Sequence, residues 1–271
     1  MFNTGQVLLG WLAAFEETGQ GIFADAARRA ACYLVATLDA DGHWRRGNSR
    51  FARADATLYN TRTAWALAEV GARLDDGGFT DAAARSLRAA AALQAPNGWL
   101  PSCCLTDPAQ PLLHTLAYAI RGFLEGGRVL GDSRLIGAAE RAARALAATV
   151  RTDGWMPGRY RSDWSPAVRW SCLTGQAQMA NNWMRLAAIT GDAQWLEPVP
   201  AVLRFLKRTQ NRRASALGLR GGIKGAWPVG GEYGAYEVLS WATKFFADAL
   251  MRHEAIEANG LGAPSPVSVL A

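Results

Sequence analysis

The chain has 271 residues, half of them hydrophobic, with 29 lysines and arginines against 23 aspartates and glutamates. This length suffices for one sizeable core. No apolar run reaches the length of a membrane span, and no charged-then-apolar leader opens the chain, so neither a membrane segment nor secretion is expected. The four cysteines lack the spacing of a disulfide framework, which favours a cytoplasmic location.

Two kinds of helix are expected to alternate along the chain. Helices of the first kind are apolar nearly all round, and four of the five begin near a threonine: residues 3–12, 60–70, 114–125, 173–184 and 237–250. Helices of the second kind are rich in alanine and arginine and carry charge along one face: residues 23–38, 79–94, 133–150 and 193–210. The four threonines are 57, 54 and 59 residues apart, so the chain is an internal repeat.

A glycine-tryptophan turn follows each helix of the second kind. The four turns lie at residues 41–44, 97–99, 153–155 and 225–227. Because Trp44, Trp99 and Trp155 recur with the repeat, we expect them to be structural wedges between repeats. Trp164 and Trp170 fall outside the period, so for them a ligand contact is as plausible as a packing role.

The alternation predicts an all-α fold, an α/α toroid. A helix that is apolar on all sides belongs in the interior, so five inner helices would be surrounded by four outer ones. Each threonine would cap an inner helix by accepting a hydrogen bond from a backbone N–H. The chain opens on an inner helix without a preceding outer one, which predicts an incomplete or shortened barrel. Residues 1–258 would form a single domain, and residues 259–271 a flexible tail.

The segments LDADGHW, LQAPNGW and VRTDGW resemble the repeats of the terpenoid cyclase and protein prenyltransferase α/α-toroid superfamily. The chain as a whole is similar to bacterial toroid proteins that are encoded among polysaccharide biosynthesis genes. The segments that carry this resemblance are residues 3–6, 59–62, 114–118, 172–178, 221–226 and 241–250. The resemblance implies the toroid fold and a glycan setting, but it implies no particular reaction.

The long loops that precede the inner helices concentrate positive charge and tryptophan. Residues 40–60, 95–113, 152–171 and 211–236 carry eleven arginines and lysines against six acids, and six of the eleven tryptophans. Guanidinium groups grip carboxylates and aromatic rings stack on sugar rings, so an acidic oligosaccharide or polysaccharide is the expected partner. Acids are interspersed in the same loops, which argues against nucleic acid. A homodimer is left open.

The strongest candidate for chemistry is the segment HTLAY. His114 and Tyr118 lie one turn apart on an inner helix, and Asn60, followed by Arg62, stands at the equivalent place one repeat earlier. Toroidal lyases and epimerases use such residues to neutralise a uronate carboxylate and to remove the neighbouring proton. The alternative is that Asn60 and His114 are helix caps and Tyr118 is core.

The predicted site therefore has two sets of residues and no metal or cofactor. The predicted catalytic residues are His114, Tyr118, Asn60 and Arg62. The predicted substrate-binding residues are Arg159, Arg161, Asp163, Trp164, Trp170, Gln176, Lys224, Glu232, Tyr236 and Lys244. Lys244 has an alternative role as the i+4 partner of Asp248, and Asn181 or Asn182 is expected to face the lumen or to bond between helices.

We expect a glycan-processing protein for an acidic, uronate-containing glycan in cell-surface polysaccharide metabolism, an enzyme of the lyase, epimerase or hydrolase kind. For hydrolysis, two of the acids Asp55, Asp107, Asp163, Glu232 and Glu237 would act as a pair, although a lone loop acid is more often a cap or an arginine partner. The alternative is a non-catalytic glycan-binding or scaffold toroid. Isoprenoid chemistry ranks third, since no Asp-x-Asp-Asp cluster and no zinc-ligand spacing is present.

Overall fold

The computed structural model describes residues 1–49 and 58–261. Within this part the chain is helical, with two short strands, and it divides into two compact units. Met1–Ala109 and Tyr118–Ala142 form the first unit, and Gln110–Ala117 joins the residues from Ala143 onward in the second. Arg50, Arg53 and Asp55, and most of the predicted C-terminal tail, lie outside the described residues.

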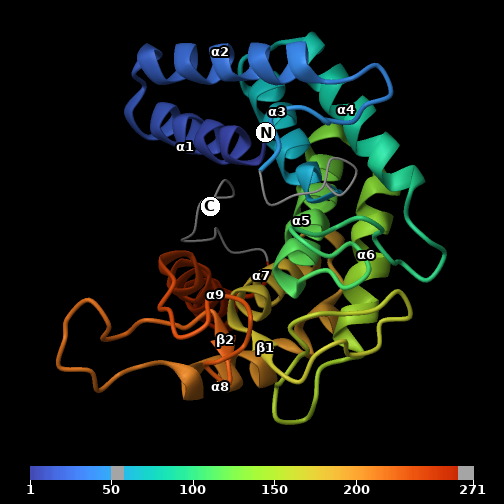
Figure 1. The fold of residues 1–271 in the computed structure, drawn as a ribbon. Coiled ribbons are helices and arrows are strands. Elements are labelled where there is room, and N and C mark those ends of the chain that lie inside the picture. The colour runs from blue at the N-terminus through green and yellow to red at the C-terminus, as the bar shows by residue number, and fades with distance from the viewer. Residues whose placement is uncertain (50–57, 262–271) are drawn as a thin grey trace. The chain divides into compact units, whose positions relative to one another are not determined.

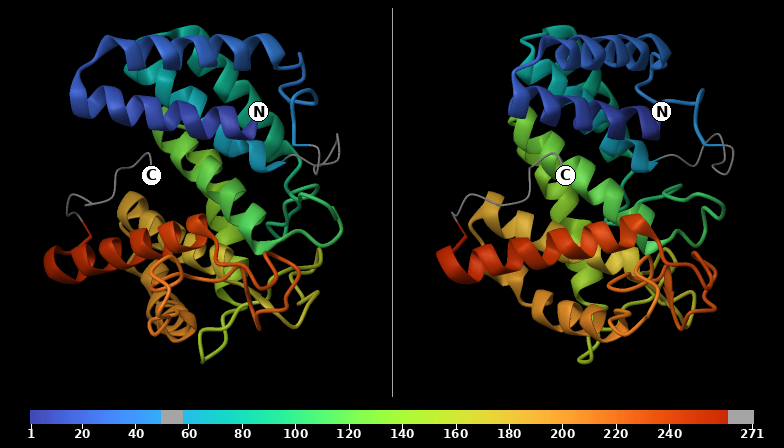
Figure 2. Two further views of the ribbon diagram at one scale, coloured as in Figure 1. Left: turned by 60° about the vertical axis from the view of Figure 1, so that its left-hand side comes forward. Right: turned by 90° about the vertical axis from the view of Figure 1, so that its left-hand side faces the viewer.

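The first unit is built from helical hairpins (Figures 1 and 2). It holds α1 (Phe2–Thr18), α2 (Gly21–Thr37), η1 (Leu58–Asn60), α3 (Thr61–Arg73) and α4 (Gly77–Ala92), with most of α5 (Leu113–Leu130) and α6 (Ser133–Ala147). Gly19, at φ 67°, ends α1 in the left-handed conformation that glycine adopts at low cost, and α2 returns alongside α1. Asp76 caps α4 by accepting from the backbone N–H groups of Gly78 and Phe79.

The second unit contains the two strands and the longest loops. It holds the end of α6, β1 (Ser171–Cys172), α7 (Leu173–Thr190), η2 (Ala193–Leu196), α8 (Val199–Thr209), β2 (Ala226–Trp227) and α9 (Ser240–Asn259). β1 pairs antiparallel with β2, with Ser171 opposite Trp227 and Cys172 opposite Ala226. This pairing brings the loop before α7 against the loop before α9 (Figure 1).

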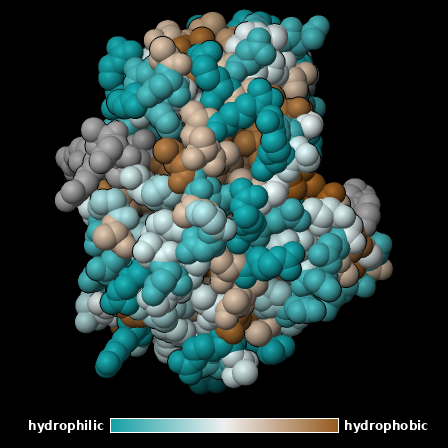
Figure 3. Space-filling view, turned by 90° about the vertical axis from the view of Figure 1, so that its right-hand side faces the viewer, coloured by the Kyte–Doolittle hydropathy of each residue, from teal (hydrophilic) through white to brown (hydrophobic). Residues whose placement is uncertain are grey.

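In the described chain, five helices of the first kind and four of the second occur in the predicted order. The predicted inner helices begin at Phe2, Thr61, Leu113, Leu173 and Ser240, each within three residues of the expected start. All of α7 from Leu173 to Ala187 is buried, as is all of α3 from Thr61 to Gly71. By contrast, α1 and α9 bury one face only. On the face shown in Figure 3 hydrophilic side chains predominate, and apolar ones are scattered in small groups.

The buried helices are less apolar than expected. In the first unit α3 buries Arg62 and Glu69, and α5 buries Arg121 and Glu125. Arg128 bridges the two glutamates, at 2.7 Å from Glu69 and 2.8 Å from Glu125. Arg73 also pairs with Glu69, and Arg121 with Glu125 at 3.1 Å. The expectation of helices apolar all round is therefore wrong for these faces, where charges are buried as compensated pairs.

The expectation that threonines cap the inner helices is also wrong. Thr4 lies inside α1, whose N-cap is Met1, and the buried Oγ1 of Thr174 has no hydrogen-bond partner in the described residues. The hydroxyl of Thr61 donates 3.1 Å across to the carbonyl of Ala119 on α5. In α1 and α7, the glycine that follows the threonine allows a close approach to the neighbouring helix. A methyl group at Gly5 would lie 2.9 Å from Thr63 Cα, and one at Gly175 would lie 2.7 Å from the backbone nitrogen of His114.

Three of the glycine-tryptophan turns share one conformation. Gly42, Gly98 and Gly154 have φ values of 87°, 83° and 84°. Each glycine lies against the backbone of the next outer helix, where a Cβ atom would clash with Arg85, Arg141 or Ala201. Trp44 and Trp99 are buried, as expected of wedges, whereas Trp155 is half-buried.

The fourth predicted turn is a different structure. Gly225–Trp227 does not follow a helix directly, because α8 ends at Thr209 and Ala226–Trp227 forms β2. Trp227 is 41% exposed and is not a wedge. The turn conformation recurs instead at residues 161–165, where Trp164, at φ 65°, takes the place of the glycine.

Candidate functional site

His114 is held at the start of α5 by groups of the second unit. Its ring is buried, and Nδ1 lies 2.8 Å from Oε1 of Gln178 on α7. The ring of Tyr233 lies 5.2 Å from the imidazole, centroid to centroid. The close approach of Gly175 to the backbone of His114 brings α7 near enough for this hydrogen bond.

The Gln178 contact determines the chemistry available to His114. An amide oxygen can only accept a hydrogen bond, so Nδ1 must carry the proton in the neutral ring. The lone pair of neutral His114 then resides on Nε2, the nitrogen that can act as a base. The arrangement is that of an oriented histidine rather than of a helix cap.

Gln178, Tyr233 and Trp241 were not among the predicted site residues. The indole Nε1 of Trp241 donates to the Tyr233 hydroxyl at 2.9 Å, so Trp241 supports the ring that lies beside His114. Gln178 belongs to a segment that carries the family resemblance and could have been chosen on that ground. Tyr233 lies in the long loop before α9, and the repeat pattern gives no signal for it.

Arg159 and Glu232 form an ion pair between the two long loops of the second unit, at 3.3 Å. The Arg159 side chain is mostly buried and also donates 2.8 Å to the carbonyl of Gln110, whereas the Glu232 side chain is 67% exposed. An exposed carboxylate is a weak partner, so a ligand carboxylate could replace it on the guanidinium at small cost. Trp170 packs against Gly158 and Gly231, where no Cβ atom would fit.

Asp163, Trp164 and Arg161 lie in one tight turn. The Asp163 carboxylate accepts from the backbone N–H of Ser165 at 2.9 Å, and its hydrogen bonds to Ser165 lower its pKa. Trp164 is buried and forms a T-shaped ring pair with Tyr160, and Arg161 donates to the carbonyl of Pro166. These contacts hold the turn together. The three residues therefore stabilise the loop, and none of these contacts is to a ligand-binding group.

Gln176 is fully buried, and both ends of its amide are already hydrogen-bonded. Its oxygen accepts from the Ser171 hydroxyl at 2.8 Å, and its nitrogen donates to the carbonyl of Gly154 at 2.7 Å. The side chain therefore ties the turn after α6 to α7. We leave Gln176 out of the site proposed below.

The remaining predicted binding residues of the second unit are accessible. Lys224 is half-buried, and Tyr236 is 78% exposed. Lys244 pairs with Asp248 at 2.6 Å, as the alternative prediction had it, while its ammonium lies 4.8 Å from the Phe245 ring centre.

Both candidate lumen asparagines bond between helices. Asn181 donates 2.9 Å to the carbonyl of Phe245 on α9, and Asn182 donates 2.9 Å to the carbonyl of Ala117 on α5. The polar positions of α7 therefore join it to its neighbours in the second unit, as predicted.

Arg62 and Tyr118 lie together in the first unit. The Arg62 guanidinium carbon is 5.0 Å from the Trp65 ring centre and 5.1 Å from that of Tyr118, and Nε donates 2.7 Å to Oε1 of Gln6. The Tyr118 ring also packs 4.7 Å from the Phe2 ring. Arg62 is thus an oriented, desolvated cation stacked on two aromatic rings.

Asn60, two residues before Arg62, makes contacts of its own. It makes no side-chain cap bond to α3, although it occupies the N-cap position, and its amide nitrogen donates 2.9 Å to Asn48. Its buried amide oxygen has no partner in the described residues. The adjoining cavity, of about 10 Å³, has room for one water molecule and no sugar.

Three of the acids that were predicted for hydrolysis make local contacts, and Glu237 is exposed. Asp107 accepts from the backbone N–H of Ala109 at 2.9 Å, Asp163 closes its turn, and Glu232 pairs with Arg159. Asp55 lies outside the described residues. The loop acids thus favour the alternative prediction, that they are caps and arginine partners.

The cysteines and metal-binding groups add no further chemistry to the site. All four cysteines are free, and burial raises the pKa of the Cys172 thiol to about 12, so Cys172 stays protonated at the start of α7. In residues 1–49 and 58–261 no group of three or more histidine, cysteine, aspartate or glutamate side chains could hold a metal ion. In the same ranges no helix has the length and apolar character that crossing a bilayer requires.

The fold resembles that of known carbohydrate enzymes. A solved structure of unsaturated glucuronyl hydrolase from Bacillus sp. GL1, described as responsible for degrading glycosaminoglycan, matches 96% of this chain and 75% of its own, with 17% identity and a TM-score of 0.74. Cellobiose 2-epimerase from Spirochaeta thermophila matches 96% of this chain and 70% of its own, with 15% identity and a TM-score of 0.72. A polysaccharide lyase matches 93% and 73%, with 13% identity and a TM-score of 0.64.

These likenesses define the class of fold. The chain is an all-α protein with the α/α-toroid fold, and this prediction is confirmed. The sequence matches no protein-family model and no curated protein sequence. At identities of 17% and below, the solved structures show the fold alone.

Proposed function

We propose that the protein is a glycan-processing enzyme that acts on an acidic, uronate-containing oligosaccharide or polysaccharide. The observation that carries the proposal is the likeness of nearly the whole chain to solved structures described as a glucuronyl hydrolase, an epimerase and a polysaccharide lyase. The oriented His114 and the positively charged loops support it. The proposed setting is cell-surface polysaccharide metabolism.

The proposed chemistry begins with proton transfer. His114, with Nδ1–H bound to Gln178, would remove a proton through Nε2. Arg159 would bind the uronate carboxylate in place of the exposed Glu232, which lowers the energy of the negative charge that develops beside it. Tyr233 and Trp241 would border the sugar ring.

Asn60, Arg62 and Tyr118 remain part of the proposal as residues of the first unit. Arg62 is the best supported of the three, because its side chain is fixed by Gln6 and by two aromatic rings. A fixed guanidinium suits a carboxylate or a sugar hydroxyl and loses little entropy on binding. The confined setting of Asn60 makes it the weakest member.

Three further proposals concern the protein as it works in the cell. We propose a cytoplasmic location, which the four free thiols support. The partner is an acidic glycan rather than nucleic acid, because acids are interspersed in the basic loops. A homodimer is compatible with this function.

One assay separates the reactions. Purified protein is incubated with saturated and with unsaturated uronate oligosaccharides, and absorbance is followed in the near ultraviolet. Elimination by a lyase creates the unsaturated chromophore, removal of a terminal unsaturated uronate consumes it, and epimerisation leaves absorbance constant while the sugar composition changes. Binding without any of these changes would contradict an enzyme and support the scaffold alternative.

A further inference from the structure

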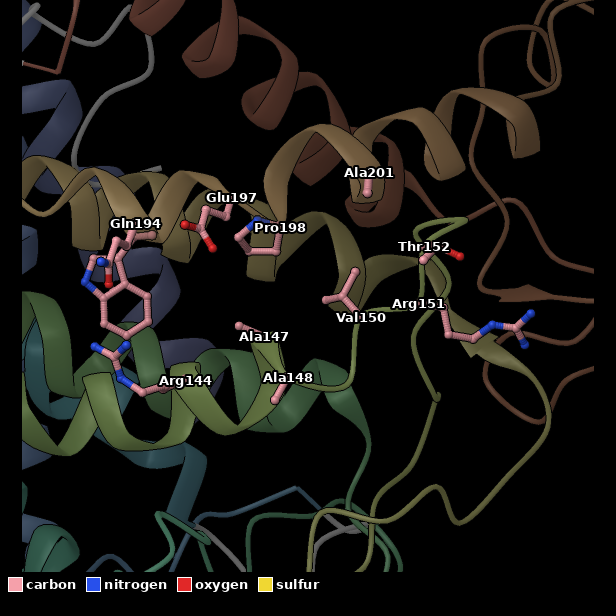
Figure 4. A pocket seen from close by; sticks show the side chains of 11 residues that line it. Arg144, Ala147, Ala148, Val150, Arg151, Thr152, Gln194, Glu197, Pro198 and Ala201 are labelled. Carbon is pink, nitrogen blue, oxygen red and sulfur yellow. The ribbon is translucent and has the colours of Figure 1, made fainter.

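A pocket lies on the second unit between α6 and the segment formed by η2 and α8, away from His114 in the sequence. Its volume is about 470 Å³, within the range of small-ligand sites. On one side it is lined by Ala147, the last residue of α6, and by Ala148 and Val150 just after it; on the other side lie Pro198 and Ala201, at the start of α8 (Figure 4). No residue of the proposed catalytic machinery belongs to its lining.

Arg144 supplies the cationic group of this pocket. Its guanidinium carbon lies 4.6 Å from the Trp195 ring centre, and no ion pair of Arg144 occurs in the described part of the chain. In Figure 4 it lies at the same end of the pocket as Gln194 and Glu197, whereas Arg151 extends away at the other end. Arg151 already pairs with Asp153, at 3.3 Å.

A second, independent observation points to a ligand. Trp195 lines the pocket and is buried, yet its indole Nε1 has no hydrogen-bond acceptor within residues 1–49 and 58–261. A buried donor without an acceptor costs free energy, so an acceptor that reaches this nitrogen would remove a cost that the free protein carries.

The charges of the pocket specify the chemistry of the ligand. Arg144 and Glu197 are both exposed, and neither forms an ion pair in the described residues, so Arg144 is available to an anionic acceptor and Glu197 to hydroxyl donors. The alanines, Val150 and Pro198 offer an apolar wall. A sugar acid combines a carboxylate, several hydroxyls and an apolar ring face in one molecule of suitable size.

We propose that this pocket is a second carbohydrate site that binds a uronic acid, with the sugar carboxylate on Arg144 and sugar hydroxyls on Glu197. The choice of a sugar rests on the proposed function, whereas the choice of an anion rests on Arg144 in the lining of the pocket. Such a site would hold an acidic glycan on the outer helices while another part of the same chain reacts. It deepens the proposed function by adding a non-catalytic binding subsite.

The test uses the full chain and the indole N–H signals of its eleven tryptophans in nitrogen-15 NMR spectra. The Trp195 signal is assigned with Trp195→Phe. Sodium glucuronate should shift this signal saturably, with a dissociation constant on the order of 1 mM. Glucose, which lacks the carboxylate, and sodium acetate, which lacks the hydroxyls, should each shift it much less at equal ionic strength.

Variants then locate the ligand. Arg144→Gln should weaken glucuronate binding at least about tenfold, because a charged hydrogen bond is lost. Glu197→Ala should weaken it less, and Arg204→Gln, an exposed arginine of α8 outside the lining, should leave it unchanged. Unchanged signals of the other tryptophans show that each variant is folded.

Several results would overturn the proposal. An unshifted Trp195 signal, an equal response to acetate, or full binding by both Arg144→Gln and Glu197→Ala would each exclude a uronate site here. The catalytic proposal is tested separately, since His114→Ala should lower turnover by about two to four orders of magnitude and leave the Trp195 titration intact. Turnover without a Trp195 response would contradict the second carbohydrate site and would leave the catalytic proposal unaffected.

Discussion

At the scale of single residues, a hydrogen-bond partner decides which nitrogen of His114 can act as a base. Gln178 accepts from Nδ1, which leaves the lone pair on Nε2. Two other residues of the second unit lie nearby, Tyr233 beside the ring and Trp241 hydrogen-bonded to Tyr233. The sequence predicted the histidine but none of its three supports, because their proximity depends on how α7 and the loop before α9 pack.

We predict that Gln178→Glu shifts the pH profile of the enzyme. A carboxylate beside Nδ1 stabilises the protonated imidazolium, so the basic form of His114 is reached only at higher pH. The acid limb of the pH–rate profile should therefore move to higher pH. Gln178→Leu, which removes the acceptor, should lower the rate without this upward movement, and an unmoved limb in Gln178→Glu would argue against His114 as the base.

At the scale of elements, small residues determine how closely helices approach. The repeated Thr-Gly-Gln suggested that the threonine caps its helix. In the structure the glycine of the motif matters instead, because it lets two helices approach closely. Gly5 lies against Thr63, and Gly175 lies against the start of α5. The helix order was predictable from hydrophobic period and repetition. The role of the glycine was not, since close approach between helices leaves no mark in one sequence.

Gly5 and Gly10 offer a matched pair within α1. Gly5→Ala places a methyl group 2.9 Å from the backbone of Thr63, and we expect a loss of about 1–3 kcal/mol in unfolding free energy. A methyl group at Gly10 would have open space within 4 Å, so Gly10→Ala should stabilise by about 0.5–1 kcal/mol through helix propensity. Urea denaturation measures both. Equal changes in the two variants would contradict the close-approach role.

The buried ion pairs of α3 and α5 give a further prediction for elements of the first unit. Arg128→Met removes one partner from each of Glu69 and Glu125, which are almost fully buried, and should cost roughly 3 kcal/mol. Arg28→Met, at an exposed pair with Asp76, should cost less than about 1 kcal/mol. Thermal and urea denaturation measure the difference. Similar losses would show that the pairs of Arg128 are as well solvated as a surface pair.

At the scale of the whole molecule, the two compact units share helices. Part of α5 and part of α6 belong to each unit. A helix is cooperative along its length, so unfolding of one unit would disrupt the other. The single-domain proposal for residues 1–258 follows from this connectivity. The fold class was predictable from the repeat. The boundary between the two units inside α5 was not, because it falls between His114 and Tyr118, which belong to one continuous helical segment of the sequence.

We therefore expect one cooperative thermal transition for the full chain. Its calorimetric enthalpy should equal the van't Hoff enthalpy, as for a single domain. Two resolved transitions, each with its own enthalpy, would show that the units unfold independently and would contradict the single-domain proposal.

The measurement that tests the central claim most directly compares wild-type protein with His114→Ala on a uronate oligosaccharide, with turnover and melting temperature recorded together. If His114 is the base, turnover should fall by about two to four orders of magnitude while the melting temperature stays nearly unchanged. Full turnover with a lowered melting temperature would contradict the account and leave His114 as a packing residue that bonds to Gln178.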